Sequence, residues 1–115
     1  MAEILRAISI RQPFVEQILK GIKRFEYRSR PTNIRERVYL HASLRPRTEK
    51  NEWRKVNREQ GQLPTGLIVG TVEIAGCTVR KYYAYALRNP KRLRTPLAAT
   101  NHPQPGFWRP RLKRR

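Results

Sequence analysis

The sequence has little or none of several residue types that common protein classes need. Cys77 is its one cysteine in 115 residues, and aspartate is absent. A single cysteine excludes an internal disulfide and the zinc sites that need several cysteines. No run of about eighteen apolar residues could span a membrane, and the first residues are too polar for a signal peptide. We therefore predict a cytoplasmic protein with no membrane partner, no metal and no cofactor.

Length and apolar content fit one small domain. Hydrophobic residues make up 38% of the chain and aromatic residues 9%, which is enough for a modest core and too much for a disordered tail. We predict a single domain over residues 1–110 and a basic C-terminal tail over residues 111–115.

Positive charge dominates the sequence. Lysine and arginine number 26 against 8 acidic residues, all glutamate, which gives a formal net charge of +18. A compact molecule with this charge attracts polyphosphates and gains free energy when their counterions are released. Binding to a membrane surface would need a basic amphipathic helix, which we do not find, while an acidic protein partner stays open. Nucleic acid is the partner that we expect.

Hydrophobic periodicity predicts a mixed α+β fold. Apolar residues at spacings of three and four indicate a helix that begins at Pro13 and ends at Lys20 and Gly21. A second, mostly polar helix is expected over residues 48–60, with only Trp53 and Val56 facing the core. The predicted strands are residues 4–10, 25–28, 38–43, 66–79 and 82–87, and residues 89–105 are expected to form a long surface loop. This order favours a small β-barrel with one or two helices at its side.

Single residues carry further structural expectations. Gly70 and Gly76 suggest a bulge or a close backbone approach in the longest strand. Phe107 and Trp108 should return to the core, and Cys77 should be a small buried apolar residue.

One segment concentrates charges that could bind a phosphate. Lys23 and Arg28 should emerge close together after the first helix, beside Glu26, while the two aromatic residues of this strand face the other side. The charges could form a surface ion-pair cluster of small energetic value. Alternatively, they could form a pocket in which the two cations hold a phosphate or a base and Glu26 orients a ligand or accepts a proton.

Four ordered motifs resemble the ASCH domain family. They are S-I-R-Q-P at residues 9–13, G-x-K-x-x-E-x-R-x-R-P at 21–31, V-Y-L-H-A-S at 38–43 and P-x-G-x-I-V-G-T-V-E-I at 64–74. The later P-Q-P-G-F-W-R-P, at 103–110, is similar to the end of small bacterial ASCH proteins. The resemblance implies a PUA-like β-barrel with a cleft beside the helix that binds single-stranded or structured RNA. The positions that it implies for the cleft are Gly21, Lys23, Glu26 and Arg28, with Arg11 and Gln12 nearby. We also expect Arg30 to contact the nucleic acid.

The resemblance also implies possible enzymes. One branch of the family hydrolyses acetylcytidine with the motif G-x-K-x-x-T-x-R, but Glu26 stands here in place of the threonine, so the proposed nucleophile is absent. Another branch implies a ribonuclease. RNA cleavage without a metal needs a base for the 2′-hydroxyl and a cation for the developing charge, which Glu26 and Lys23 could supply. His41 is an alternative base, although a lone histidine in a strand is more often structural; His102 lies in the predicted loop.

Two further polar residues have open roles. Ser43 could face the cleft or serve as a turn hydroxyl, which we favour. Glu73 should point to solvent or pair with an arginine, and the alternative places it in the pocket as the acid partner of Lys23.

Aromatic and basic residues toward the C-terminus could add binding surface. Tyr82, which follows two basic residues, could stack on an unpaired base or help to close the barrel. Arg109 and Arg111, with the tail, could hold phosphates without reading sequence. We therefore expect an RNA-binding module, with a ribonuclease or a modified-nucleoside amidohydrolase as the alternative. A DNA-coating or ribosome-associated basic protein is a third interpretation.

Overall fold

The computed structural model describes residues 4–79 and 81–113, and its elements follow one another in the predicted order of strand, helix, two strands, helix and further strands. The elements are β1 (Ala7–Ile10), α1 (Phe14–Leu19), β2 (Phe25–Arg28), β3 (Arg37–Ala42), α2 (Lys50–Arg54), β4 (Ile68–Val79), β5 (Tyr83–Leu97) and β6 (Phe107–Trp108). Neither helix in this part of the chain is long and apolar enough to cross a membrane.

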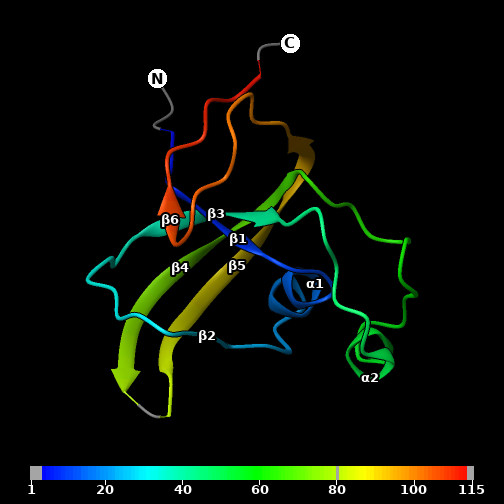
Figure 1. The fold of residues 1–115 in the computed structure, drawn as a ribbon, viewed down its shortest axis with the longest axis horizontal. Coiled ribbons are helices and arrows are strands. Elements are labelled where there is room, and N and C mark those ends of the chain that lie inside the picture. Colours follow the sequence, from blue (N-terminus) through cyan, green and yellow to red (C-terminus); the bar gives the residue numbers. More distant parts are fainter. Residues whose placement is uncertain (1–3, 80, 114–115) are drawn as a thin grey trace.

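All strands belong to one sheet that does not close. Their order is β2-β5-β4-β3-β1-β6, with β1 parallel to β3 and the other neighbours antiparallel (Figure 1). The edges β2 and β6 do not pair with each other within the described residues. The predicted β-barrel is therefore corrected to an open sheet, because a closed barrel needs a hydrogen-bonded ladder between its first and last strands. The mixed α+β class with two short helices is confirmed.

Side chains bridge the gap that the open sheet leaves. Arg28 at the end of β2 donates from Nη2 to the carbonyl oxygen of Ser9 on β1, at 2.8 Å. The ring of Tyr85 on β5 stacks against Phe107 on β6, with their centroids 6.0 Å apart. We call this gap between β2 and the β1–β6 edge the seam.

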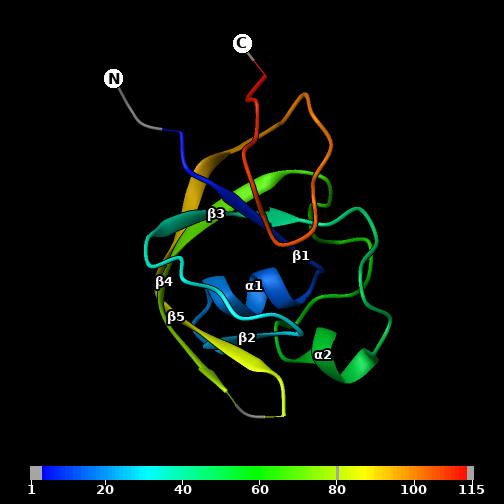
Figure 2. The same cartoon turned by 60° about the vertical axis from the view of Figure 1, so that its left-hand side comes forward.

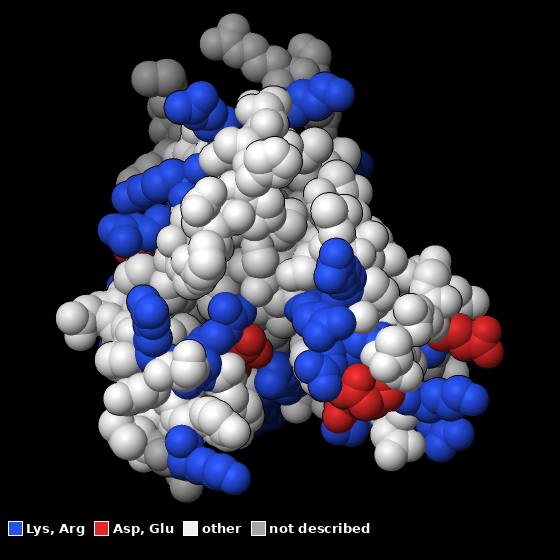
Figure 3. Space-filling view, in the orientation of Figure 1, with Lys and Arg blue, Asp and Glu red and all other residues white. Residues whose placement is uncertain are grey.

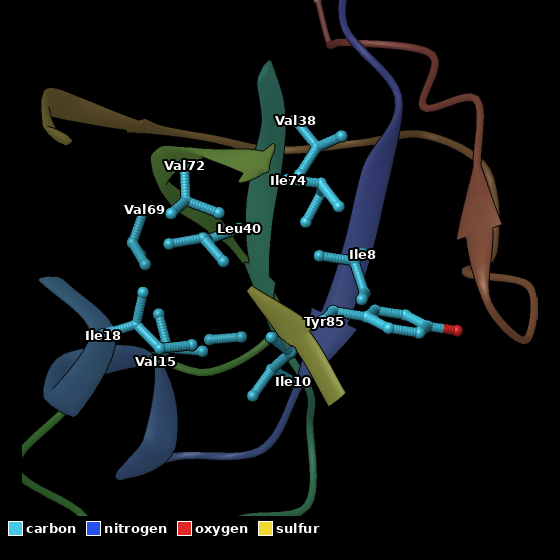
Figure 4. Close-up of a cluster of buried hydrophobic side chains, with 11 residues drawn as sticks. Ile8, Ile10, Val15, Ile18, Val38, Leu40, Val69, Val72, Ile74 and Tyr85 are labelled. Carbon is cyan, nitrogen blue, oxygen red and sulfur yellow. The ribbon is translucent and has the colours of Figure 1, made fainter. Parts of the chain in front are cut away.

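The core lies between α1 and the sheet. The long β4–β5 ribbon bends around α1 (Figure 2), and Val15 and Ile18 of α1 point toward the buried side chains of the sheet (Figure 4). A Cβ atom on Gly70 would lie 2.6 Å from Leu19 Cδ2 and 2.8 Å from the backbone oxygen of Lys91 on β5. The predicted close backbone approach at Gly70 is therefore confirmed, and it lets α1 pack directly on β4.

The first helix ends where its sequence indicates. Gly21 follows α1 with φ of 76°, a left-handed conformation that suits glycine. Glu16 of this helix is only 5% exposed, and Arg92 of β5 donates to both of its carboxylate oxygens at 2.8 Å. This bidentate ion pair ties α1 to the sheet.

The predicted loop over residues 89–105 is wrong for its first half, because β5 continues to Leu97. Pro90 and Pro96 argued against a strand, since proline cannot donate to a ladder. Register shifts along the β4–β5 pair interrupt the ladder at several points, and such irregular pairing accommodates residues that lack a donor.

The second helix is much shorter than predicted. It ends at Arg54 and not near residue 60, and Asn57 has a positive φ of 55°. Trp53 and Val56 are buried as expected. No apolar side chain follows them before Leu63, so a longer helix would gain nothing from packing.

Two expectations about single side chains differ in outcome. Trp108 is buried and Phe107 packs against the core, as predicted. Cys77 is only half-buried, at the margin of the core.

Candidate functional site

A basic pocket occupies the seam. Its volume is about 550 Å³, and β1, β2, the start of α1 and residues 43–47 enclose it. In the space-filling view, lysine and arginine side chains flank a hollowed region on the face that carries β2 and α1 (Figure 3). The lining residues are Ser9, Ile10, Arg11, Phe14, Lys23, Glu26, Tyr27, Arg28, Ser43 and Arg47. Four of them are cations and one is an acid, so the pocket carries a surplus of positive charge.

Glu26 lies between two cations at the centre of this pocket. Its Oε2 accepts from Arg28 Nε at 3.0 Å, and its Oε1 is 3.6 Å from Lys23 Nζ. The three side chains are 11–26% exposed, which is too little for a solvated surface cluster. The ion pairs fix the positions of both cations, while one carboxylate cannot neutralise two positive charges.

Strand β2 is oriented with its charged side inward. Glu26 is 9% exposed, whereas Phe25 is 43% and Tyr27 53% exposed. The predicted alternation of the two faces is confirmed, but the buried face is the polar one. Burial of a carboxylate is tolerated here because both of its oxygens are paired with cations.

Aromatic rings complete the cation environment. Lys23 Nζ lies 5.0 Å from the ring centroid of Phe14 and 5.2 Å from that of Tyr27. The electron-rich faces of the rings attract the ammonium group. Lys23 is therefore held from three sides, by two rings and the carboxylate of Glu26.

Arg11 and Gln12 shape the wall opposite β2. Arg11 donates from Nε to the carbonyl oxygen of Arg45, at 2.8 Å, and from Nη2 to that of Pro46, at 3.1 Å. This anchors the segment that brings Arg47 into the pocket. Gln12 is 1% exposed and does not line the pocket. Its side chain hydrogen-bonds the backbone of Pro64 and Glu16, so its contribution is to position its neighbours.

A buried hydrogen-bond network stands behind the Ser9 side of the pocket. Ser9 Oγ is 2.9 Å from His41 Nδ1 and accepts from Trp108 Nε1 at 3.1 Å. His41 is 5% exposed and does not line the pocket. Burial lowers the pKa of His41, and a hydrogen bond to the backbone of Gly66 opposes this shift. The surroundings favour a neutral, structural imidazole.

Ser43 and Glu73, whose roles the sequence left open, lie in different surroundings. Ser43 lines the pocket, against the favoured expectation of a turn hydroxyl alone. Glu73 does not: it pairs with Arg37 at 3.2 Å and accepts from Asn89. The pairing with an arginine is confirmed, and the alternative that placed Glu73 beside Lys23 is wrong.

The other predicted binding residues lie outside the pocket. Gly21 lines a smaller neighbouring hollow, and Arg30 follows β2, where its carbonyl oxygen accepts from the hydroxyl of Tyr85. Tyr82 is exposed in the turn between β4 and β5. Arg109 and Arg111 hydrogen-bond through their backbones to Asn101. Three basic residues of the predicted binding surface lie outside the described residues: Arg80, Arg114 and Arg115.

Sequence reasoning missed Phe14, Tyr27 and Arg47 as pocket residues. Tyr27 carried a signal, because it follows Glu26 directly and precedes Arg28. Phe14 looked like one more residue of an apolar helical stripe. Arg47 had no local signal, since only the folding of residues 43–47 against Arg11 brings it to the seam.

The chemistry of the pocket is that of anion binding with one possible proton acceptor. Among residues 4–79 and 81–113, no cluster of three His, Cys or Glu side chains could hold a metal ion. The groups at hand are guanidinium and ammonium donors, the Glu26 carboxylate, three hydroxyls and two aromatic rings. Such a set can hold a phosphate and a planar ring at the same time.

Comparison with known families gives one match. Residues 8–94 match the model of the ASCH domain, which includes every residue that lines the pocket. The motif at residues 103–110 lies beyond the matched range. No curated protein matches the chain.

Proposed function

This chain belongs to the ASCH domain family, in the PUA-like superfamily, and we propose that it binds single-stranded RNA by holding a nucleotide in the pocket at the seam. The family indicates a function related to RNA. The observation that carries the finer proposal is the placement of Lys23 and Arg28 on either side of Glu26 in one hollow. A cytoplasmic location stays a prediction.

The charge of the pocket supports a phosphate ligand. Arg11, Lys23, Arg28 and Arg47 are all lining cations; Glu26 partly neutralises Lys23 and Arg28, and Glu49, outside the lining, pairs with Arg47. Arg28 uses Nε and Nη2 within the protein, which leaves donors on its guanidinium for a ligand. A phosphate that enters would meet donors already held in place, so it loses little free energy to side-chain ordering.

The rings of the pocket support RNA in a single-stranded form. Tyr27 is more than half exposed at the rim of the pocket, beside the cations. A base can stack on such a ring only when it has left its neighbours in a duplex. Ring and cations together therefore favour an unpaired nucleotide over a double helix.

The proposal is tested by the binding of a fluorescently labelled single-stranded RNA at several salt concentrations. We expect the affinity to fall with salt, with a log–log slope of about −0.7 for each phosphate contact. Arg28→Ala should weaken binding by about tenfold or more, because a charge-assisted hydrogen bond contributes roughly 1.5–3 kcal/mol.

A matched variant controls for the loss of charge alone. Arg94→Ala removes one positive charge from the part of β5 beyond the segment that pairs with β2. We expect Arg94→Ala to change the affinity by less than about threefold, because exposed charges act weakly through salt solution. Equal losses in both variants would reject the pocket in favour of nonspecific attraction. A titration without any salt dependence would reject the electrostatic basis altogether.

A ribonuclease is the second candidate, favoured by the 3.6 Å between Lys23 Nζ and Glu26 Oε1. Glu26 would accept the proton of a 2′-hydroxyl, and the 2′-oxygen would attack the adjacent phosphorus while Lys23 neutralises the developing charge. The bond to the 5′-oxygen would break, and that oxygen would take a proton from water.

Purified protein incubated with labelled RNA, beside Lys23→Ala, separates the two candidates. Cleavage by the parent protein that is lost in Lys23→Ala would support the enzyme. RNA that stays intact with the parent protein would reject the enzyme and leave RNA binding as the remaining candidate. Cleavage that persists in Lys23→Ala would indicate a contaminating nuclease. We do not propose the amidohydrolase, because Glu26 replaces the motif threonine.

A further inference from the structure

A second hollow adjoins the pocket on the outer face of β2. It has a volume of about 560 Å³ and is lined by Phe14, Gln17, Ile22, Lys23, Arg24, Phe25, Tyr27, Glu52 and Lys55. We call it the outer groove. Phe14, Lys23 and Tyr27 line both hollows, so the two hollows adjoin on either side of these side chains.

The outer groove exposes apolar surface that the fold leaves uncovered. Ile22 is 48% exposed, Phe25 43% and Tyr27 53%. Three large apolar side chains at this exposure line one hollow, and apolar side chains that gather in this way are typical of contact sites. Phe25 and Tyr27 are exposed because β2 turns its polar side inward to supply Glu26 and Arg28, which leaves the aromatic side facing solvent.

The charge around these side chains selects the class of ligand. The groove has three cations, Lys23, Arg24 and Lys55, and one acid, Glu52. Hydrogen bonds from Lys55 and then from Gln17 lower the pKa of Glu52, so this carboxylate already has its partners inside the protein. Exposed rings among surplus cations are complementary to a chain of unpaired bases joined by phosphates.

We propose that the outer groove is a second nucleotide subsite, in which the base next to the one in the pocket stacks on Phe25 and Tyr27. The inference rests on the proposed RNA-binding function and extends it from one nucleotide to two or more. The outer groove adds affinity without sequence selectivity, because every base offers an aromatic face to stack on a ring.

Phe25 is the residue that tests the subsite. It lines the outer groove and not the pocket at the seam, whereas Tyr27 lines both. We compare the affinities of the parent protein and Phe25→Ala for a random-sequence RNA hexamer and for an equimolar mixture of the four nucleoside 5′-monophosphates. Phe25→Ala should weaken hexamer binding by about tenfold, as one lost stacking contact predicts. Binding of the mononucleotides should stay unchanged.

Two further variants distinguish aromatic stacking from nonspecific hydrophobic contact, and thermal unfolding checks that the fold is intact. Phe25→Trp should retain hexamer affinity and Phe25→Leu should not, because only the tryptophan keeps an aromatic face. Val79→Ala is the matched control, since Val79 is 74% exposed in the distal part of β4, and it should leave both affinities unchanged. Thermal unfolding of each variant should match the parent protein, because the side chain of Phe25 is largely in solvent.

The outcomes distinguish the subsite from the proposed function. Unchanged hexamer affinity in Phe25→Ala, with hexamer binding still lost in Arg28→Ala, would overturn the subsite alone. Parent protein that binds the hexamer no more tightly than the mononucleotides would overturn it as well. Failure of the parent protein to bind either ligand would overturn both proposals. Self-association that Phe25→Ala abolishes, while hexamer affinity stays the same, would assign the outer groove to a second copy of the chain and reject the subsite.

Discussion

Two buried glutamates in this small protein have different surroundings. Glu16 on α1 faces one arginine, Arg92, which donates to both carboxylate oxygens. Glu26 on β2 faces Lys23 and Arg28 together, with a single contact from each. The first group is a neutral pair packed against the core. The second has a surplus positive charge and opens into a hollow.

The difference separates a structural ion pair from a binding site. One carboxylate paired with one bidentate guanidinium has no net charge, so the pair does not attract an ionic ligand. A carboxylate shared by two cations leaves a charge that only an incoming anion can balance. Burial of a glutamate therefore does not identify the candidate binding site, because both glutamates are buried. The number of cations around each glutamate distinguishes the two.

The largest expected effect comes from removing the partner of Glu16. Arg92→Ala should lower the free energy of unfolding by about 2–3 kcal/mol, below the 3–5 kcal/mol of a fully buried pair, since half of the Arg92 side chain is exposed to solvent. Urea denaturation measures the loss. RNA affinity of the folded protein should not change.

Lys91→Ala is the matched control for Arg92→Ala. It removes a charge from the adjacent position in β5, and Lys91 forms no ion pair with the described residues. Equal stability of the two variants would mean that the ion pair with Arg92 does not stabilise the fold. The distinction between a structural ion pair at Glu16 and a binding site at Glu26 would then be rejected.

A third buried titratable group, His41, extends the comparison to pH. Burial holds its pKa below the ordinary value of 6.5. As pH falls through 6.5, the unfolded chain binds a proton that the folded protein does not yet accept, so the folded state loses stability. Between pH 7.5 and 5.5 we expect the free energy of unfolding to fall, by no more than ~1.4 kcal/mol, the linkage limit for an imidazole that stays neutral in the folded state.

The variant His41→Asn isolates this contribution from the glutamates, which titrate in both proteins. Its free energy of unfolding should depend less steeply on pH than that of the parent protein over the same interval. Parallel curves for the two proteins would show that His41 is not held neutral by the fold.

The smallest expected effect concerns Glu26 itself. Glu26→Gln keeps the size of the side chain and removes the one negative charge of the pocket. Affinity for single-stranded RNA should rise by about threefold, since roughly 0.65 kcal/mol of repulsion is a modest value for partly screened charges. Fluorescence titration at low salt measures it. A loss of affinity would instead mean that Glu26 chiefly orients Lys23 and Arg28.

The sequence predicted those features that depend on local periodicity. The apolar stripe predicted from Phe14 to Ile22 and the stop at Gly21 encode α1, although Ile22 itself is exposed, and the alternation in residues 25–28 encodes β2. Lys23, Glu26 and Arg28 were found together because all three lie within six residues, after the helix and along one strand.

Features that depend on distant contacts were not accessible in this way. The extension of β5 past Pro90 depends on irregular pairing with β4, and the two prolines masked it. The open edge of the sheet depends on how far β2 and β6 stay apart, which no window of sequence contains. Arg47 reaches the pocket through hydrogen bonds that Arg11 makes to a segment more than thirty residues away.

The position of β2 at the edge of the sheet has a consequence for how the site is maintained. Among the residues that the structure describes, its backbone ladder joins it to β5 alone, over residues 25–28. The guanidinium of Arg28 links it to β1. Local opening of this strand would dismantle the pocket while the core around α1 stays intact. A bound polyanion would draw β2 and β1 together through their shared cations, so occupancy and local order would rise together.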